Sequence, residues 1–411
     1  MMDNLFHLSR FFLKTYHQQY QRYLVKRHPF SSRFSIIVGP RGTGKTTMII
    51  QHLLTWANND ILSKRMLYVP VDHFAVGKQP LYEIAENFYN FGGQLIAFDE
   101  IHKYSNWSLE LKSIYDRFPK LKIIASGSSA LEIWKGSHDL ARRAIVYTLE
   151  GLSFREYVDL MMNTDTSPVT LDNLLTNHES LAETYIHLCE SNQHKILELF
   201  HHYLEKGFFP YFREYQNPEH YYITLEQMIH TTLESDLLSI YPSLNGSSIK
   251  KIKKLLSIIA ASVPFTPDLK HIKTLIEVAD ERTLKNYLFY LEQARLINVL
   301  YRQGKGLRVM EKPEKIYLNN PNQVYALLSQ GRENVGNIRE TFFINMLSVD
   351  YRITASKKGD FIIDDQYTFE VGGKNKGFKQ IKGVEKSYLA LDNLETGIQN
   401  KIPLWLFGFL Y

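Results

Sequence analysis

The chain has 411 residues, of which 44% are apolar and 22% charged, and its formal net charge is +5. This composition excludes a disordered chain, and the length predicts about two to four domains. The single cysteine, Cys189, excludes an internal disulfide framework or a cysteine zinc site and fits a reducing, cytoplasmic location. No run of about 18 apolar residues occurs, so we expect no membrane-spanning segment and no membrane partner.

The first feature that carries chemistry is the sequence GPRGTGKT, which lies between a β-type run at 34–38 and a helical apolar pattern at 46–56. A strand, a glycine-rich turn and a helix in this order form the context of a phosphate-binding loop. The glycines let successive backbone N–H groups face one point, where the helix N-terminus also favours an anion. A bare glycine turn is the alternative interpretation. The residues expected to bind nucleotide are Gly39, Pro40, Arg41, Gly42, Thr43, Gly44, Lys45, Thr46 and Thr47.

Two of these side chains have specific predicted roles. Lys45 would reach the β- and γ-phosphates and act in catalysis, and the Thr46 hydroxyl would ligate Mg²⁺. The sequence therefore predicts ATP and Mg²⁺ as ligands.

A second motif, QLIAFDE, places an acidic pair after the apolar run 95–98, which has the composition of a buried parallel strand. Asp99 would lie at the carboxyl end of that strand, where open α/β sheets bind their ligands, and would complete the Mg²⁺ shell. Glu100 would polarise the attacking water. The alternative is an acidic pair that only caps the strand end.

Further polar residues follow the next predicted strand, at 121–125. Ser126 would touch the γ-phosphate or the water, unless the serine-rich turn merely caps the following helix. Arg142 or Arg143 would stabilise transition-state charge on a nucleotide of the same or a neighbouring chain. A solvated basic pair is the alternative.

The stretches DEIHKYSNWSLELKSIYDRFPKLKIIASGSSALEI and DLARRAIVYTLEGLSFREY resemble a family of prokaryotic AAA-type P-loop ATPases that carry a C-terminal domain similar to restriction endonucleases. The resemblance is close over 34–160 and continues in order along the remainder. It implies a Mg-ATP site built as above, with Ser126 at the sensor position, and a helical lid after the core. His102 and Trp107 match family positions, and we expect them to pack beside the site. Many such cores form rings, although monomeric relatives exist, so a homo-oligomer is one expected state.

The middle of the chain has helical periodicity until about residue 245, and three helical segments followed by two β-like runs then suggest a winged helix-turn-helix. Residues 247–318 contain 14 Lys and Arg against 7 Asp and Glu, which favours a nucleic-acid face. A packing module with solvated lysines is the alternative. The residues expected to meet double-stranded DNA are Arg282, Lys285, Asn286, Lys305 and Arg308.

The last ninety residues combine a helix at 334–347 with β-runs at 359–363 and 367–371 and a final apolar run that predicts a buried strand. Asp360 and Glu370 would lie on adjacent strands and hold a second Mg²⁺, as restriction-type nucleases do. Such sites have a lysine two positions after the second acid, but this chain has Gly372 there. We expect Lys374 to substitute, and the family pattern places Gln380 and Tyr388 on a helix that completes the site.

The sequence thus predicts an α/β protein with an AAA-type P-loop core at 1–155, a helical lid at 156–245, a winged helix at 246–320 and a nuclease-like domain at 321–411. The expected function is Mg-dependent ATP hydrolysis, with the nucleotide state controlling engagement of DNA or a partner by the C-terminal half. Two alternatives stay open: a slowly hydrolysing, nucleotide-gated protein-interaction module, and an ATP-regulated DNA nuclease.

Overall fold

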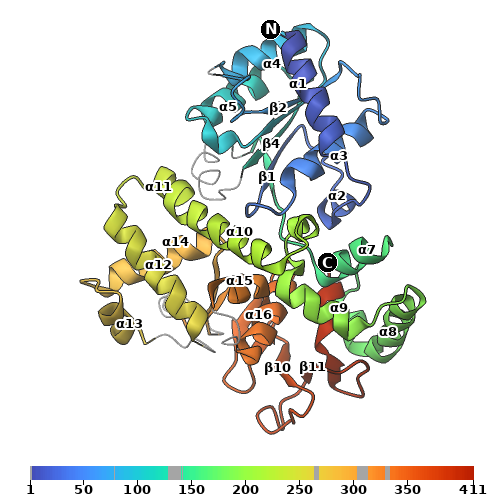
Figure 1. Ribbon diagram of the computed structural model, residues 1–411, viewed down its shortest axis with the longest axis vertical. Helices are drawn as coiled ribbons and strands as arrows, with labels where there is room; N and C mark the ends of the chain where they lie inside the picture. Colours follow the sequence, from blue (N-terminus) through green and yellow to red (C-terminus); the bar gives the residue numbers. More distant parts are fainter. Residues whose placement is uncertain are drawn as a thin grey trace. The chain divides into compact units, whose positions relative to one another are not determined.

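Residues 2–77, 79–127, 140, 142–262, 268–302, 313–328 and 334–411 are described by a computed structural model (Figure 1). The chain divides into two units, Met1–Gly151 and Leu152–Tyr411, and each is described by itself. Among the described residues, no helix is both long enough and apolar enough to cross a bilayer.

The N-terminal unit is built on a five-stranded sheet in the order β2-β3-β4-β1-β5, and every neighbouring pair is parallel. Strands β1 to β3 are buried along their whole length, as expected when both faces of a parallel sheet are covered. Strand β4 separates β1 from β3, so its carboxyl end falls between the ends of those two strands. The bounds are β1 (Phe34–Val38), β2 (Met66–Pro70), β3 (Leu95–Asp99), β4 (Lys122–Gly127) and β5 (Ile145–Thr148).

Helices cover this sheet and protect its edge. Helix α1 packs on edge strand β2, where the Tyr68 N–H donates to Ser9 Oγ at 3.0 Å. Helix α3 leaves β1 through the glycine-rich turn and packs against β2, β3 and β4. The helical elements are α1 (Met2–Thr15), α2 (Tyr23–Arg27), α3 (Lys45–Trp56), α4 (Leu81–Asn90), the 3₁₀ turn η1 (Ile101–Lys103) and α5 (Trp107–Arg117). The predicted parallel α/β core is confirmed.

The C-terminal unit begins with helices, as the periodicity predicts. Two of its segments are π-helical, η2 and η4, and such segments often mark functional positions. The elements up to the first strand are α7 (Phe154–Met162), α8 (Leu171–Ser191), α9 (Ile196–His202), η2 (Tyr203–Gly207), η3 (Pro210–Glu214), α10 (Pro218–Thr231), η4 (Thr232–Asp236), α11 (Leu237–Ile240), α12 (Gly246–Ala261), α13 (Leu269–Leu275) and α14 (Glu281–Gln293).

Two sheets follow these helices. Strands β6 (Ile297–Leu300) and β7 (Lys315–Leu318) pair antiparallel, so three helices and two strands occur in the order expected of a winged helix. A mixed sheet in the order β12-β11-β10-β9-β8 ends the unit (Figure 1). Its elements are α15 (Pro321–Leu327), α16 (Val335–Leu347), β8 (Ile353–Ala355), β9 (Phe361–Ile363), β10 (Tyr367–Gly373), β11 (Ser387–Asp392), β12 (Lys401–Pro403) and η6 (Leu404–Phe409).

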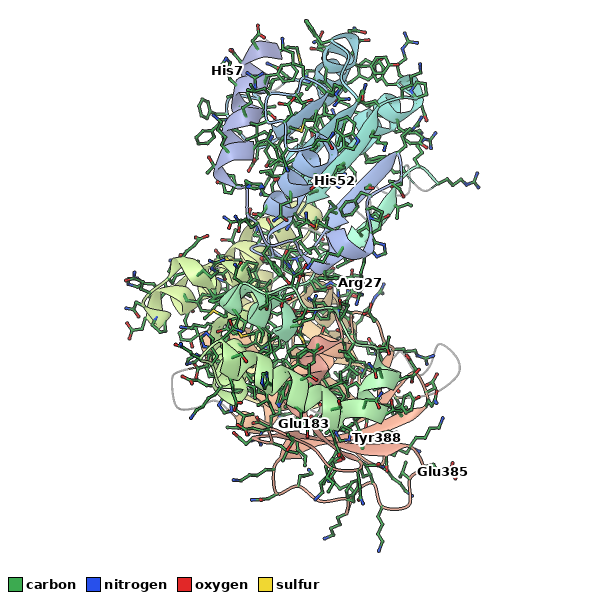
Figure 2. The ribbon with its side chains drawn as sticks, turned by 90° about the vertical axis from the view of Figure 1, so that its right-hand side faces the viewer. His7, Arg27, His52, Glu183, Glu385 and Tyr388 are labelled. Carbon is green, nitrogen blue, oxygen red and sulfur yellow. The ribbon has the colours of Figure 1, made fainter. Side chains whose placement is uncertain are left out.

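Two local expectations for the chain end are wrong. The final apolar run forms only the short strand β12 and then the 3₁₀ helix η6, because a short buried apolar run suits either geometry. Tyr388 lies on strand β11, not on a helix, and its ring stacks on Phe369 with centroids 5.5 Å apart (Figure 2). Gln380 lies in a turn segment between β10 and β11.

Candidate functional site

The phosphate loop (residues 39–46) has the backbone that its glycines predict. Gly42 and Gly44 have φ of 78° and 90°, in the left-handed region that favours glycine. Gly39 is required for a different reason, since a Cβ there would come within 2.2 Å of the Leu149 carbonyl oxygen. Helix α3 begins directly after Gly44, so the N–H groups of its first turn lie at the loop.

Lys45 lies inside this loop rather than in solvent. Its side chain is buried, and Nζ donates to the carbonyl oxygens of Gly39 at 2.9 Å and Pro40 at 3.0 Å. The ammonium is therefore held above the loop, where a phosphate oxygen could replace either carbonyl as its acceptor.

Asp99 is the centre of the site. It is buried at the carboxyl end of β3, and its Oδ2 accepts hydrogen bonds from the Thr46 hydroxyl and the Tyr68 hydroxyl, each at 2.6 Å. Its Oδ1 accepts from the Ser126 hydroxyl at the end of β4. The structure thus brings Thr46, Asp99 and Ser126 together. A hydroxyl and a carboxylate converging beside a phosphate loop fit Mg²⁺, which takes few protein ligands and completes its shell with phosphates and water.

Glu100 follows Asp99 in a conformation unusual for a non-glycine residue, with φ 56° and ψ 40°. Its Oε2 lies 3.5 Å from Nε2 of the buried His102. Burial raises the pKa of the Glu100 carboxyl, and the nearby Lys45 ammonium opposes that shift. A water-orienting role for Glu100 stays a prediction.

The two predicted arginines differ in their surroundings. Arg143 forms a bidentate pair with Asp116 of α5, with Nε–Oδ1 at 2.9 Å and Nη2–Oδ2 at 3.0 Å. Arg142 is exposed and has φ 77°. Asp139 and Ala141 of the same segment, and Ser128 and Ser129 of the serine-rich turn, lie outside the described residues. A catalytic role for either arginine stays a prediction.

Two contributors to the site were missed from the sequence. Tyr68 lies within a strand that looks like ordinary core, yet it donates to Asp99, and burial together with that carboxylate raises its pKa. Arg22 precedes α2, is buried, and donates to the Thr43 carbonyl of the phosphate loop. Once Asp99 is assigned, the alternation of side chains between the two faces of β2 could have predicted that Tyr68 lies near it. No local pattern in the sequence identifies Arg22.

A second charged cluster lies in the C-terminal unit. Lys315 Nζ is 3.1 Å from Asp360 Oδ1 and 3.7 Å from Glu340 Oε2, and Asp360 Oδ2 accepts from the Val371 N–H at 2.9 Å. The buried Glu370 meets Lys376 Nζ at 2.5 Å. The cluster (Lys315, Glu340, Asp360, Glu370 and Lys376) therefore pairs its acids with lysines. In the described ranges, no group of three His, Cys, Asp or Glu is arranged to hold a metal ion, and the second Mg²⁺ expected at Asp360 and Glu370 stays a prediction.

The lysine that meets Glu370 is Lys376, not the expected Lys374. A Cβ built at Gly372 would come within 2.8 to 3.0 Å of the Cβ, Cγ and Cδ atoms of Lys376. The Lys376 stem thus fills the space that a side chain at 372 would occupy, and its ammonium reaches Glu370. The Gln380 side-chain amide also lies against Glu370, and with its nitrogen turned inward it donates to Oε2 at 2.9 Å.

The predicted recognition helix α14 has one solvent face. Asp280 caps it by accepting from the Thr283 N–H at 2.8 Å. Arg282, Lys285 and Asn286 are exposed, while Leu284, Leu288 and Leu291 are buried. Phe289, not singled out from the sequence, continues the exposed stripe and is 46% exposed. Lys305 and Arg308, expected on the wing, lie outside the described residues.

Comparisons with known proteins agree with the N-terminal site. Residues 31–158 match an AAA domain family, and residues 197–334 match a domain of unknown function (DUF8612). The uncharacterized protein MJ1637 of Methanocaldococcus jannaschii is 28% identical over 296 residues, which are 68% of this chain. The chain spans 59% of the length of that relative.

Two solved structures align at low scores. AMPPCP-bound DnaA from Aquifex aeolicus aligns over 66% of this chain and 84% of its own, at 15% identity and a TM-score of 0.26. Domain III of the Thermotoga maritima replication initiation protein DnaA aligns over 46% and 90%, at 15% identity and a TM-score of 0.25. Scores this low carry no argument about this chain. Residues 31–158 are thus similar to an AAA domain, and the five-stranded parallel sheet of the N-terminal unit fits a P-loop NTPase fold.

Proposed function

We propose that the N-terminal unit binds ATP with Mg²⁺ and hydrolyses it. The observation that carries the proposal is the convergence of Lys45, Thr46, Asp99 and Ser126 from the carboxyl ends of three neighbouring strands. The match of residues 31–158 to an AAA domain supports the same assignment.

Each side chain has a role that its position suits. The phosphate loop would bind the β- and γ-phosphates through backbone N–H groups, and the Lys45 ammonium would offset charge on the transferred phosphoryl group. Thr46 and Asp99 would hold Mg²⁺, which supplies further charge stabilisation when bound. Glu100 would orient the attacking water and accept its proton, and Ser126 would hold the Asp99 carboxylate in place.

A hydrolysis assay tests this proposal. Phosphate release from ATP is measured with Mg²⁺ and with EDTA, for the wild-type chain and Asp99→Asn. We expect release that requires Mg²⁺ and falls by about 10²-fold or more in the variant. Two results would overturn the assignment: phosphate release by the wild-type chain that EDTA does not reduce, or release by Asp99→Asn that equals that of the wild type.

We further propose that the nucleotide state controls contact with double-stranded DNA through α14. Its exposed residues Arg282, Lys285, Asn286 and Phe289 recur at i, i+3, i+4 and i+7, so they share one helix face. The positive balance of residues 247–318 supports an anionic partner. DNA affinity measured between low and physiological salt should fall steeply, since lysine and arginine contacts release counterions. A flat salt response would instead favour a protein partner.

A second candidate function, phosphodiester hydrolysis, is favoured by one observation: Lys376 supplies an ammonium to Glu370 from the space over Gly372. As they stand, Asp360 and Glu370 are paired with Lys315 and Lys376, so a metal ion would have to compete with these ammonium groups for the carboxylates. A charge-compensated structural cluster is the competing explanation. Incubation of supercoiled plasmid with Mg²⁺ or Mn²⁺ separates the two, because only a nuclease would convert it to the nicked or linear form.

A further inference from the structure

Arg22 contacts both the phosphate loop and the chain segment that leaves the N-terminal unit. It is 5% exposed, and one Nη donates to the Thr43 carbonyl of the loop. The other Nη donates to the carbonyl oxygens of Glu150 at 2.8 Å and Gly151 at 2.7 Å. Gly151 is the last residue of the unit. A planar guanidinium with several fixed donors can hold three carbonyls at once, whereas an ammonium cannot match this fork.

The exit segment (residues 148–151) meets the phosphate loop at a second point. The Leu149 N–H donates to the Val38 carbonyl at 2.8 Å, and the Leu149 carbonyl lies so close to Gly39 that no side chain could be placed there. The start of the loop therefore meets this segment directly at Leu149, and Thr43 in the middle of the loop is joined to Glu150 and Gly151 through Arg22. The Tyr23 hydroxyl also holds this segment, donating to the Thr148 carbonyl at 3.2 Å.

The hold on Thr43 bears on how the loop binds phosphate. The Thr43 carbonyl and the Gly44 N–H belong to one trans peptide unit, so they point in opposite directions in a rigid plane. A rotation that aims the Gly44 N–H at a phosphate must also move the Thr43 oxygen against Arg22. The segment just before Arg22 is held by α3, because Gln51 Nε2 donates to the carbonyls of Gln18 at 2.7 Å and Tyr20 at 2.6 Å.

The residue after the exit segment is anchored in the C-terminal unit. The Leu152 N–H donates to the Phe208 carbonyl at 2.7 Å, and its own carbonyl accepts from the Tyr203 hydroxyl at 2.6 Å. Tyr203 begins the π-helical segment η2, which is a strained insertion rather than regular helix. A shift of Gly151 is therefore passed along the covalent chain to a residue held by η2 and its neighbour.

We propose that Arg22 is a positioning residue that transmits nucleotide occupancy from the phosphate loop to the exit segment and thence to Leu152. The inference rests on the proposed nucleotide binding and names its route to the C-terminal unit. Removing the Arg22 guanidinium leaves the loop able to bind nucleotide, because Lys45, Thr46 and Asp99 are untouched. It uncouples the exit segment from the phosphate loop.

Hydrogen–deuterium exchange of the full chain tests this route, with no nucleotide, with Mg-ADP and with a non-hydrolysable Mg-ATP analogue. In the wild-type chain we expect nucleotide to slow exchange in the phosphate loop and to change exchange of the Leu149 to Leu152 amides by at least about threefold. In Arg22→Lys the loop should still be protected at saturating nucleotide, and the change at 149–152 should be lost. Arg27→Lys, the same substitution five residues further along at the end of α2, should behave as wild type (Figure 2).

The outcomes separate two failures. A wild-type loop that gains no protection from nucleotide contradicts the proposed function itself. A protected loop with no response at 149–152, or an Arg22→Lys chain with the full response, overturns the coupling alone. If Arg22→Lys melts well below wild type, Arg22→Gln, which keeps two donors, provides the second comparison. A full nucleotide-dependent change of exchange at 149–152 in Arg22→Gln would also overturn the proposal.

Discussion

Glu100 and His102 form a pair in the N-terminal unit, with the Glu100 carboxylate 3.5 Å from the buried imidazole. Glu100 adopts a left-handed backbone directly after the end of β3. Strain of this kind costs about 1 to 3 kcal/mol and persists where the surrounding structure enforces it. The arrangement gives the carboxylate next to Asp99 a fixed direction, which is what a water-orienting group requires.

Replacing Glu100 should therefore separate binding from hydrolysis. In Glu100→Gln we expect ATP turnover to fall by about 10² to 10⁴-fold, because the amide cannot accept the proton of the attacking water. Affinity for Mg-ATP should stay within about threefold of wild type, since Lys45 and Asp99 are unchanged. Single-turnover hydrolysis and equilibrium binding measure the two quantities, and equal losses in both would contradict the assigned role.

The two arginines at 142 and 143 should respond differently to substitution. Arg143 is paired with Asp116 at the surface, where such pairs contribute little, so Arg143→Ala and Asp116→Ala should lower stability only slightly and by similar amounts. Arg142→Ala should leave stability unchanged and reduce ATP turnover at high protein concentration, if it acts on the nucleotide of a neighbouring copy. If ATP turnover is lost in Arg143→Ala but kept in Asp116→Ala, then Arg143 and not Arg142 is the arginine that acts on the nucleotide.

His52 predicts a pH-dependent stability for the N-terminal unit. Burial, together with the Lys122 charge, lowers the pKa of the His52 imidazole to about 4, and its ring packs edge-on against Phe30 (Figure 2). Because the unfolded pKa is near 6.5, the neutral ring stabilises the fold fully above about pH 6.5 and progressively less as the pH falls towards 4. The loss amounts to about 3 kcal/mol at most.

Melting temperatures at pH 7.5 and pH 5 check this expectation. The wild-type chain should lose more stability between the two values than His52→Gln, which cannot titrate. Equal losses of melting temperature in both proteins would show that groups other than His52 control the stability between pH 7.5 and pH 5.

Lys376 allows a positional exchange. If its ammonium serves the role expected at position 372, Lys376→Ala should lose any plasmid cleavage, and the double variant Gly372→Lys/Lys376→Ala should recover part of it, because the space over Gly372 is then vacant. Lys374→Ala is the matched control and should change nothing. A wild-type chain that leaves plasmid intact with both Mg²⁺ and Mn²⁺ would contradict the nuclease candidate and favour a structural cluster.

Much of the nucleotide site was predictable because its signals are local. The phosphate loop is a continuous strand, turn and helix, and Asp99 ends an apolar run whose burial places it at a ligand-binding edge. Ser126 required one further step, the strand order, since only the insertion of β4 between β1 and β3 brings it to Asp99.

The remaining contributors depend on tertiary structure that the sequence does not encode locally. Arg22 reaches residues 21 and 129 positions away, and nothing in its neighbours indicates those partners. The sequence could not show whether Lys374 or Lys376 reaches Glu370, because the path of the turn after β10 decides which lysine side chain packs over Gly372. Domain limits at 155, 245 and 320 stay predictions, since the structure groups residues 152–411 as one unit.

The most direct test of the account is equilibrium binding of a fluorescent ATP analogue with Mg²⁺ to the wild-type chain and to Lys45→Ala. We predict saturable, Mg²⁺-dependent binding by the wild-type chain and a loss of affinity of at least about tenfold in the variant, which removes the ammonium held above the phosphate loop. Absence of binding by a folded wild-type chain, or equal affinity in Lys45→Ala, would contradict the assignment of this loop as the nucleotide site.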